Sequence, residues 1–234
     1  MTQETFLLAL TAASVGFVHT LLGPDHYLPF IVLARARRWS LGRTAAITLL
    51  CGTGHVLSSV VLGFVGIAAG IAVGRLEAVE SSRGSLAAWL LIGVGVAYFA
   101  WGLHRALRRH GQHRHRFPTR ETLHDLSHDT DPAAAEAAGR VRLTPWALFI
   151  VFVLGPCEPL IPVLMYPAAT AGVGAALLVA AVFGVATLVA MTAVVLAGTA
   201  GLARLPLGPL ERFSHAAAGA AIAASGLAVQ FLGL

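Results

Sequence analysis

The stretch Gly23-Pro24-Asp25-His26-Tyr27-Leu28-Pro29 places a helix-breaking pair, a carboxylate and an imidazole inside an apolar segment. Gly155-Pro156-Cys157-Glu158-Pro159 does the same in a second apolar segment. An ionised group at membrane depth costs at least ~2.5–3.5 kcal/mol, and a broken helix is tolerated there only when protein or a cavity covers it. We expect Asp25 and Glu158 to be the carboxylates inside the apolar segments. The two stretches therefore predict one central polar site.

The composition is typical of a membrane protein that crosses the bilayer several times. The 234 residues are 57% hydrophobic and 12% charged, and the mean hydropathy is +0.78. All 16 basic residues are Arg and most flank apolar segments, so the pI near 10.2 indicates membrane orientation rather than nucleic-acid binding. The first residues carry no basic segment, so we expect no cleaved signal peptide. Cys51 and Cys157 both lie in apolar segments, which excludes a secreted-type disulfide framework.

The apolar segments predict an all-α integral membrane protein with six transmembrane helices, the first and fourth broken at Gly-Pro. The expected spans are 5–34, 43–73, 85–103, 144–168, 175–203 and 214–232. The loops after spans one, three and five hold fourteen Arg, and the loop after span two holds two, balanced by two Glu. The positive-inside rule then predicts an inner (plasma) membrane protein with both termini outside and the long third loop in the cytoplasm.

The two halves of the chain repeat. A shift of 132 positions lays Gly23-Pro24 onto Gly155-Pro156 and also superposes Gly42, Gly52 and Gly66 on later glycines. Three-helix halves start on opposite sides of the membrane, so the repeat is inverted, as in many secondary transporters. We expect a first repeat over 1–103, a cytoplasmic His- and Arg-rich loop over 104–143 and a second repeat over 144–234.

Four residues of the first half form a candidate metal site: His19, Asp25, His26 and His55. His19 and His26 are seven positions apart, close to two helical turns, and can share a face. Imidazoles with a carboxylate suit divalent first-row metals such as nickel, cobalt and zinc. The alternative is structural: Asp25 neutralised by a histidine at a helix break, with His55 a core histidine.

The second half supplies Cys157 and Glu158, which the repeat lays onto Asp25 and His26. Thiolate and carboxylate extend the metal site, although a buried Cys also serves as a small hydrophobe. Thr187 falls at the repeat position of His55, and Met191 lies one turn beyond it. We expect both to line the cavity, with simple packing as the alternative for Met191.

The long loop holds six of the ten histidines, interleaved with Arg. These are His104, His110, His113, His115, His124 and His128. Such tracts often bind metal, which predicts an accessory metal-binding loop. A solvated basic loop near anionic lipid is the alternative.

These residues resemble a superfamily of small six-span proteins. It includes the nickel/cobalt transporters, urease-accessory-type membrane proteins and the transmembrane thiol-disulfide carriers of cytochrome c biogenesis. His19-Thr-Leu-Leu-Gly-Pro-Asp25-His26 is similar to the nickel/cobalt signature His-x4-Asp-His, with five intervening residues here. Gly54-His55-Val-Leu-Ser58 is similar to the Gly-His-Ser element of that family, and Gly155-Pro156-Cys157 to the Gly-Pro-Cys of the thiol-disulfide carriers.

The resemblance and the site together predict a transporter, not an enzyme, for a divalent transition metal. Its partners are the lipid bilayer and the metal ion as substrate, with no permanently bound cofactor and no nucleic acid. Metal competes with protons for neutral imidazole, which favours proton coupling, and the cytoplasmic histidines favour efflux.

Two other functions stay open. A thiol-disulfide electron carrier needs two thiols that meet, but Cys157 and Cys51 map by the repeat onto Asp25 and Phe183 rather than onto each other. An exporter of a sulfur oxyanion or organic anion needs cationic groups at membrane depth, and we expect no Arg there.

Overall fold

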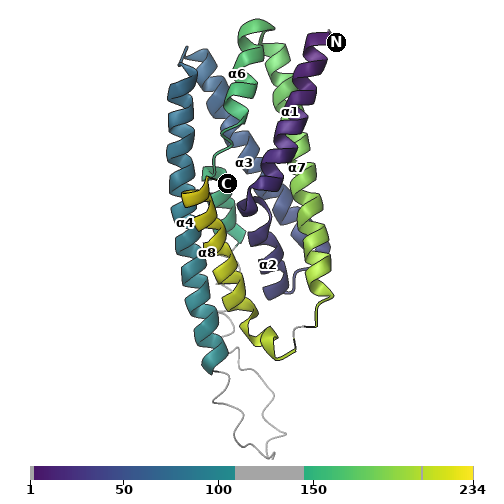
Figure 1. Cartoon of the computed structure of the whole chain (residues 1–234), viewed down its shortest axis with the longest axis vertical. Coiled ribbons are helices and arrows are strands. Elements are labelled where there is room, and N and C mark those ends of the chain that lie inside the picture. Colours follow the sequence, from purple (N-terminus) through teal and green to yellow (C-terminus); the bar gives the residue numbers. More distant parts are fainter. Residues whose placement is uncertain (1–2, 109–144, 207, 234) are drawn as a thin grey trace, which may run out of the picture.

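The computed structural model describes residues 3–108, 145–206 and 208–233, and every regular element in these ranges is a helix (Figure 1). Five helical segments are apolar and long enough to cross a membrane. They are Gln3–Leu22, Leu41–Ala68, Val73–Arg108, Val173–Ala203 and Leu210–Leu232. Two shorter apolar helices, Pro145–Leu154 and Leu160–Thr170, lie between the third and fourth of them along the chain. The described chain is therefore an all-helical membrane protein.

The first predicted span consists of three helical pieces. Helix α1 (Gln3–Leu22) ends before Gly23, the 3₁₀ helix η1 covers Pro24–His26, and α2 (Leu28–Ala36) follows. Pro24 has no N–H to continue the α1 hydrogen bonds, and its fixed φ suits the first position of a new helical turn. The chain therefore stops and restarts in the middle of the molecule, where Asp25 and His26 lie (Figure 1).

The expected fourth span is likewise two short helices rather than one. The helix Pro145–Leu154 ends at Gly155-Pro156, and α6 (Leu160–Thr170) begins after a turn in which the Leu160 N–H donates to the Cys157 carbonyl at 2.9 Å. Neither piece alone has the length of about 20 residues that a transmembrane helix requires. Among the described residues, five rather than six helices therefore pass the length criterion, and the inverted repeat stays a prediction.

The predicted third span, 85–103, is too short. Helix α4 runs over Val73–Arg108, so the charged residues expected in the second loop lie on its first turns. The segment contains no Pro, and Glu80 pairs with Arg83 at the helical i,i+3 spacing. Because hydropathy falls where charges begin, it marks the end of an apolar segment and not the end of a helix. His104 is therefore also helical, and it is exposed.

The expected fifth and sixth spans agree closely with the remaining long helices, whereas the expected second span, 43–73, runs five residues past the end of its helix. Helix α3 covers Leu41–Ala68 and α7 covers Val173–Ala203. Helix α8 covers Ser214–Leu232, preceded by the 3₁₀ helix η3 (Gly208–Phe213). Helix α7 packs against α1, α2, α3 and α6, while α8 packs along α4 (Figure 1). Buried side chains of α2, α3, α4, α7, α8 and the helix Pro145–Leu154 form the largest hydrophobic cluster.

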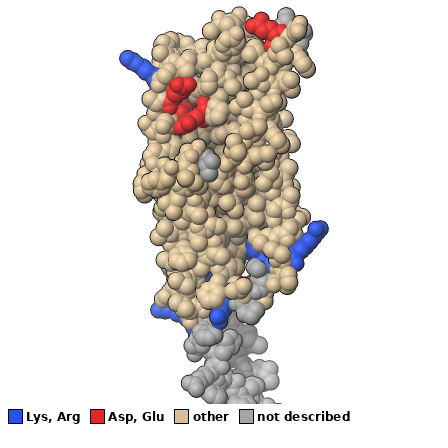
Figure 2. All heavy atoms as spheres, viewed as in Figure 1, with Lys and Arg blue, Asp and Glu red and all other residues tan. Residues whose placement is uncertain are grey.

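The outer surface is apolar between two ends that carry charge (Figure 2). On α1 alone, Phe6, Leu7, Leu10, Phe17 and Leu22 are 50–62% exposed. A continuous apolar belt of this kind is the surface that a lipid bilayer covers.

Most Arg side chains of the described chain lie at one end of the molecule (Figure 2). This Arg-rich end consists of Arg35, Arg37, Arg38, Arg43, Arg105, Arg108, Arg204 and Arg212. Two contacts connect the end of α2 with the chain after α7 there. Arg35 donates to the carbonyl of Ala203, and Arg38 forms an ion pair with Glu211 at 3.1 Å. The placement of this Arg-rich end in the cytoplasm stays a prediction.

Helices α4 and α8 approach closely because glycines face the partner helix. A Cβ on Gly95 would meet the backbone of Ala223, and a Cβ on Gly219 would meet the backbone of Phe99. Gly93, two residues away on α4, has nothing within 4 Å of the corresponding position. Small residues at helix interfaces are the usual means of close packing in membranes.

Gly95 and Gly93, on the same helix, give a matched test of the packing. Gly95→Ala should destabilise the purified protein by about 1–3 kcal/mol, because the new methyl group overpacks a backbone contact. Gly93→Ala should be neutral or stabilising, because Ala is the better helix former. Thermal unfolding in detergent, followed by size-exclusion chromatography, measures both. Equal melting temperatures for the two variants would contradict the close α4–α8 contact.

Candidate metal centre

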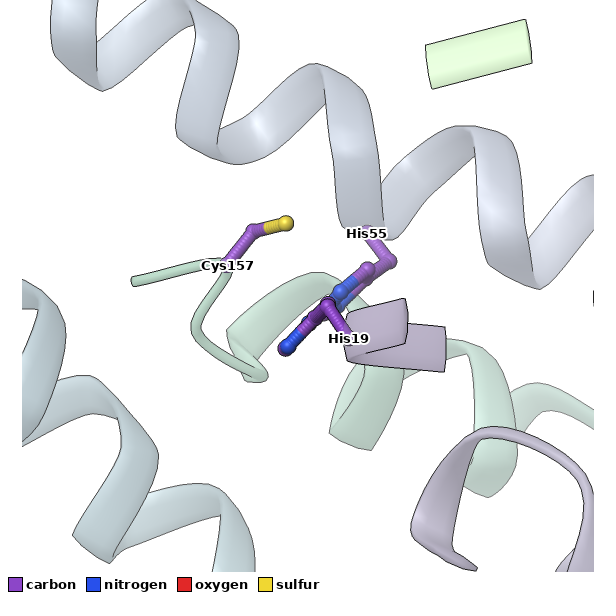
Figure 3. A group of neighbouring side chains, drawn as sticks. All are labelled: His19, His55 and Cys157. Atoms are coloured by element: carbon purple, nitrogen blue, oxygen red, sulfur yellow. The ribbon is translucent and has the colours of Figure 1, made fainter. Parts of the chain in front are cut away.

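Four of the predicted site residues meet in the middle of the molecule. His19 lies in the last turn of α1, His26 in η1, His55 in α3, and Cys157 in the segment that follows the helix Pro145–Leu154. His26, His55 and Cys157 are buried, and His19 is half-buried. Figure 3 shows the sulfur of Cys157 and the rings of His19 and His55 directed toward one space. Both helix breaks thus contribute to one cluster.

The contacts of His26 determine which of its ring nitrogens carries the proton. Its Nδ1 lies 3.1 Å from Asp25 Oδ1 and 3.2 Å from the Gly23 carbonyl oxygen. Both partners are acceptors, so Nδ1 must donate to them and bear the hydrogen. Asp25 therefore orients the His26 ring and leaves the lone pair of a neutral imidazole on Nε2. This is the usual role of a carboxylate behind a metal-binding histidine.

The same reasoning applies to His55. Its Nδ1 lies 3.3 Å from the carbonyl oxygen of Phe152, which can only accept, so Nδ1 carries the hydrogen. The Nε2 atoms of His55 and His26 are 3.4 Å apart. If both imidazoles are neutral, two lone pairs face each other inside the protein. This arrangement needs a cation between the rings, either a proton or a metal ion.

His19 and Cys157 complete the cluster. One potential ligand atom from each of His19, His55 and Cys157 lies within 4.8 Å of the other two. The ring centres of His19 and His26 are 4.8 Å apart, with the rings nearly perpendicular. Within the described chain, the buried Nε2 of His19 has no hydrogen-bond partner. An unpaired buried polar atom is costly, and this one lies beside the other donors, where it is available to a ligand.

The distances suit a transition-metal ion. Two imidazole nitrogens at ~2.0–2.1 Å from a tetrahedral metal lie about 3.3–3.4 Å apart, as the His26 and His55 nitrogens do. The wider 4.8 Å group needs donor shifts of about 1 Å to reach such bond lengths. Three imidazoles and one thiol are a donor set for soft or borderline cations rather than for Mg²⁺ or Ca²⁺.

The other predicted ligands and lining residues lie elsewhere. Glu158 is exposed in the turn between Cys157 and α6, and it does not belong to the group that holds His19, His55 and Cys157. Thr187 is buried against α1, where a Cβ at position 16 in place of Gly16 would meet its Oγ1 at 3.0 Å. Met191 packs in the large hydrophobic cluster, the alternative that the sequence left open. Of the loop histidines, His104 is exposed on α4 and the other five lie outside the described residues.

A small cavity adjoins the cluster on the side of α4. Asp25 and His55 provide its polar lining, and the rest of its wall is mostly apolar side chains and glycines. This wall consists of Gly84, Ala87, Ala88, Leu91, Val151, Phe152, Gly155, Pro156 and Val229. The cavity can hold a water molecule. Such a water needs hydrogen-bond partners, and the side chains of Asp25 and His55 are the ones that this lining offers. Asp25, 25% exposed, therefore lies at the open side of the site.

A buried ion pair that the sequence did not predict lies next to the cluster. Glu80 is fully buried, and its Oε1 lies 2.6 Å from the guanidinium of Arg83, which is 20% exposed. The expectation that Asp25 and Glu158 are the carboxylates among apolar residues therefore needs a correction, because Glu80 is buried as well. An Arg also lies in an apolar helix, contrary to expectation. The i,i+3 spacing of Glu80 and Arg83 was the available signal.

Comparison with known proteins gives one match. The family described as the cytochrome c biogenesis protein transmembrane region matches residues 28–233, most of the chain. No curated protein and no solved structure matches the chain. The match supports the wider membrane-carrier superfamily and gives no support to its nickel/cobalt or urease-accessory-type branch. The chain belongs to the cytochrome c biogenesis protein transmembrane region family.

Proposed function

We propose that the chain is a membrane carrier for a transition-metal cation, which His19, His26, His55 and Cys157 bind in the middle of the protein. The observation that supports this most directly is the 3.4 Å approach of two Nε2 atoms whose partner nitrogens must both donate hydrogen bonds. A cation between the rings removes the repulsion between their lone pairs. The unpaired Nε2 of His19 and the nearby thiol of Cys157 extend the same coordination shell.

The donor atoms limit the class of cation. Imidazole and thiolate favour zinc, copper, nickel or cobalt over magnesium, calcium or manganese. Metal binding requires neutral imidazoles and a deprotonated thiol, so each bound ion displaces protons. The cavity beside Asp25 supplies a place where water can accept such a proton. Proton exchange is therefore the energy source that this site favours.

The family match supports a second candidate, a thiol-disulfide carrier, better than it supports metal transport. Such a carrier joins two thiols as a disulfide when it passes two electrons and two protons to an acceptor. The chain contains only Cys51 and Cys157. Both are buried and free, and they pack in different hydrophobic clusters. Electron transfer by this pair therefore requires a rearrangement that brings the two sulfurs together.

The first prediction concerns the carboxylate behind His26. Asp25→Asn should lower metal affinity by about 10–100-fold, because the ring loses the charged acceptor that orients it. Glu158→Gln removes the carboxylate at the other helix break and should leave affinity unchanged, since Glu158 is exposed. Metal uptake by proteoliposomes across zinc, nickel, cobalt, manganese and iron measures both variants.

One result from these two variants would contradict the proposed site. If Glu158→Gln abolishes uptake while Asp25→Asn transports normally, the site is not the cluster around His26. Insertion of each variant into the liposomes, measured by protease protection, provides the control for expression and folding.

The second prediction separates the two candidate functions. Cys157→Ser should remove a sulfur ligand and weaken metal binding, whereas Cys51→Ser should bind and transport metal normally. Both substitutions replace a buried thiol by a hydroxyl, so they have similar effects on packing. The comparison uses metal titration of the purified variants and electron transfer from a reduced thioredoxin to an acceptor on the opposite side of the vesicle.

A thiol-disulfide carrier gives the opposite pattern in that comparison. Either single substitution then abolishes electron transfer, because a disulfide cannot form with one thiol. Wild-type electron transfer that both variants lose, together with no metal binding by wild type, would establish the second candidate.

A further inference from the structure

The buried Glu80–Arg83 pair occupies the place of a missing helical hydrogen bond. In an unbroken helix the N–H of Cys157 would donate to the carbonyl of Val153, four residues earlier. Here the Cys157 N–H donates to Glu80 Oε2 at 3.2 Å, and the Val153 carbonyl accepts from Arg83 at 2.9 Å. The carboxylate satisfies the orphan donor and the guanidinium satisfies the orphan acceptor.

This replacement of a backbone hydrogen bond by side chains explains why the apolar interior contains two charged groups. A broken helix among apolar residues must find partners for its freed backbone groups. A buried charge is tolerated when it is paired and hydrogen-bonded. The ion pair at 2.6 Å meets both requirements at once, because each charged group bonds to the other and to one end of the break.

The pair also reaches the helix that carries His55. The same Arg83 nitrogen donates to Ser58 Oγ at 2.9 Å, and Ser58 donates in turn to the His55 carbonyl at 2.8 Å. One network therefore connects the backbone of Cys157 with the helical turn that presents His55. These are two of the three residues whose potential ligand atoms lie within 4.8 Å.

We propose that Glu80 and Arg83 are positioning residues, which hold the Cys157 thiol against the histidines and so decide whether sulfur enters the coordination shell. This inference rests on the proposed metal-carrier function and deepens it. Neither side chain touches the ion. Without the pair, the segment after Gly155-Pro156 loses its anchor on α4, and the site retains only its histidines.

Cobalt(II) bound to the purified full chain provides the test, because a cobalt–thiolate bond gives a charge-transfer absorption that cobalt–imidazole bonds lack. The double variant Glu80→Gln/Arg83→Gln removes both charges and leaves no unpaired ion buried. It should lose most of the thiolate absorption and bind cobalt about 10–100-fold more weakly, while the imidazole-dependent bands remain. Arg83→Lys keeps the charge opposite Glu80 but cannot span Ser58 and Val153, so it should give an intermediate loss.

The same helix offers matched controls. Arg75 and Glu77 are exposed on the first turns of α4, and Arg75→Gln/Glu77→Gln makes the same change of charge. This control should show wild-type absorption and affinity. The rate at which Cys157 reacts with a maleimide provides a second measure in Cys51→Ser protein, and it should rise in the positioning variants only.

The outcomes separate this inference from the function on which it rests. If wild type shows a thiolate absorption that Cys157→Ser lacks, and Arg83→Lys and the double variant keep it at full strength, the positioning role is wrong and the metal site stands. If wild type and Cys157→Ser give the same spectrum, sulfur is not a ligand and the proposed site itself fails.

Discussion

The constraint on which the rest of the structure depends is the need to satisfy backbone groups at two broken helices among apolar residues. No water is available in a bilayer core to take up these groups. At the first break, η1 restarts the chain, and the Gly23 carbonyl accepts from the backbone and the ring of His26, which Asp25 orients. At the second, Glu80 and Arg83 take the place of the missing bond between Cys157 and Val153. The polar side chains that repair the breaks are also those that surround the candidate site.

This arrangement links family membership to chemistry. The match to the cytochrome c biogenesis transmembrane family indicates a membrane carrier, and both candidate functions involve Cys157. They differ in its partner: a second thiol in one case, and a metal ion held with His19, His26 and His55 in the other. Cys51 packs in a separate cluster, whereas Cys157 lies beside His19 and His55, and the rings of these two histidines both contact that of His26. The local geometry therefore favours metal, and the family description favours thiol chemistry.

Much of the candidate site could be predicted from sequence, because Gly-Pro in an apolar segment marks a break and a charged residue there is conspicuous. Grouping His19, Asp25, His26 and His55 required only that reasoning. Depth along a helix was harder to predict. Hydropathy placed Glu80 in a loop, because it does not show that α4 continues through charged residues, and it does not show that Glu158 is exposed in a turn. The i,i+3 spacing indicates the ion pair itself, but its hydrogen bonds to Val153 and Cys157 join residues 70 and 77 positions apart, which no local pattern contains.

The most direct test of the account is X-ray absorption spectroscopy of zinc bound to the purified full-length protein. The geometry predicts about one equivalent of tightly bound zinc, with one sulfur at ~2.3 Å and imidazole nitrogens at ~2.0–2.1 Å. The sulfur contribution should disappear in Cys157→Ser and persist in Cys51→Ser. Failure to bind zinc or any other transition metal, or a coordination shell of oxygen alone, would contradict the claim that this cluster is a metal centre.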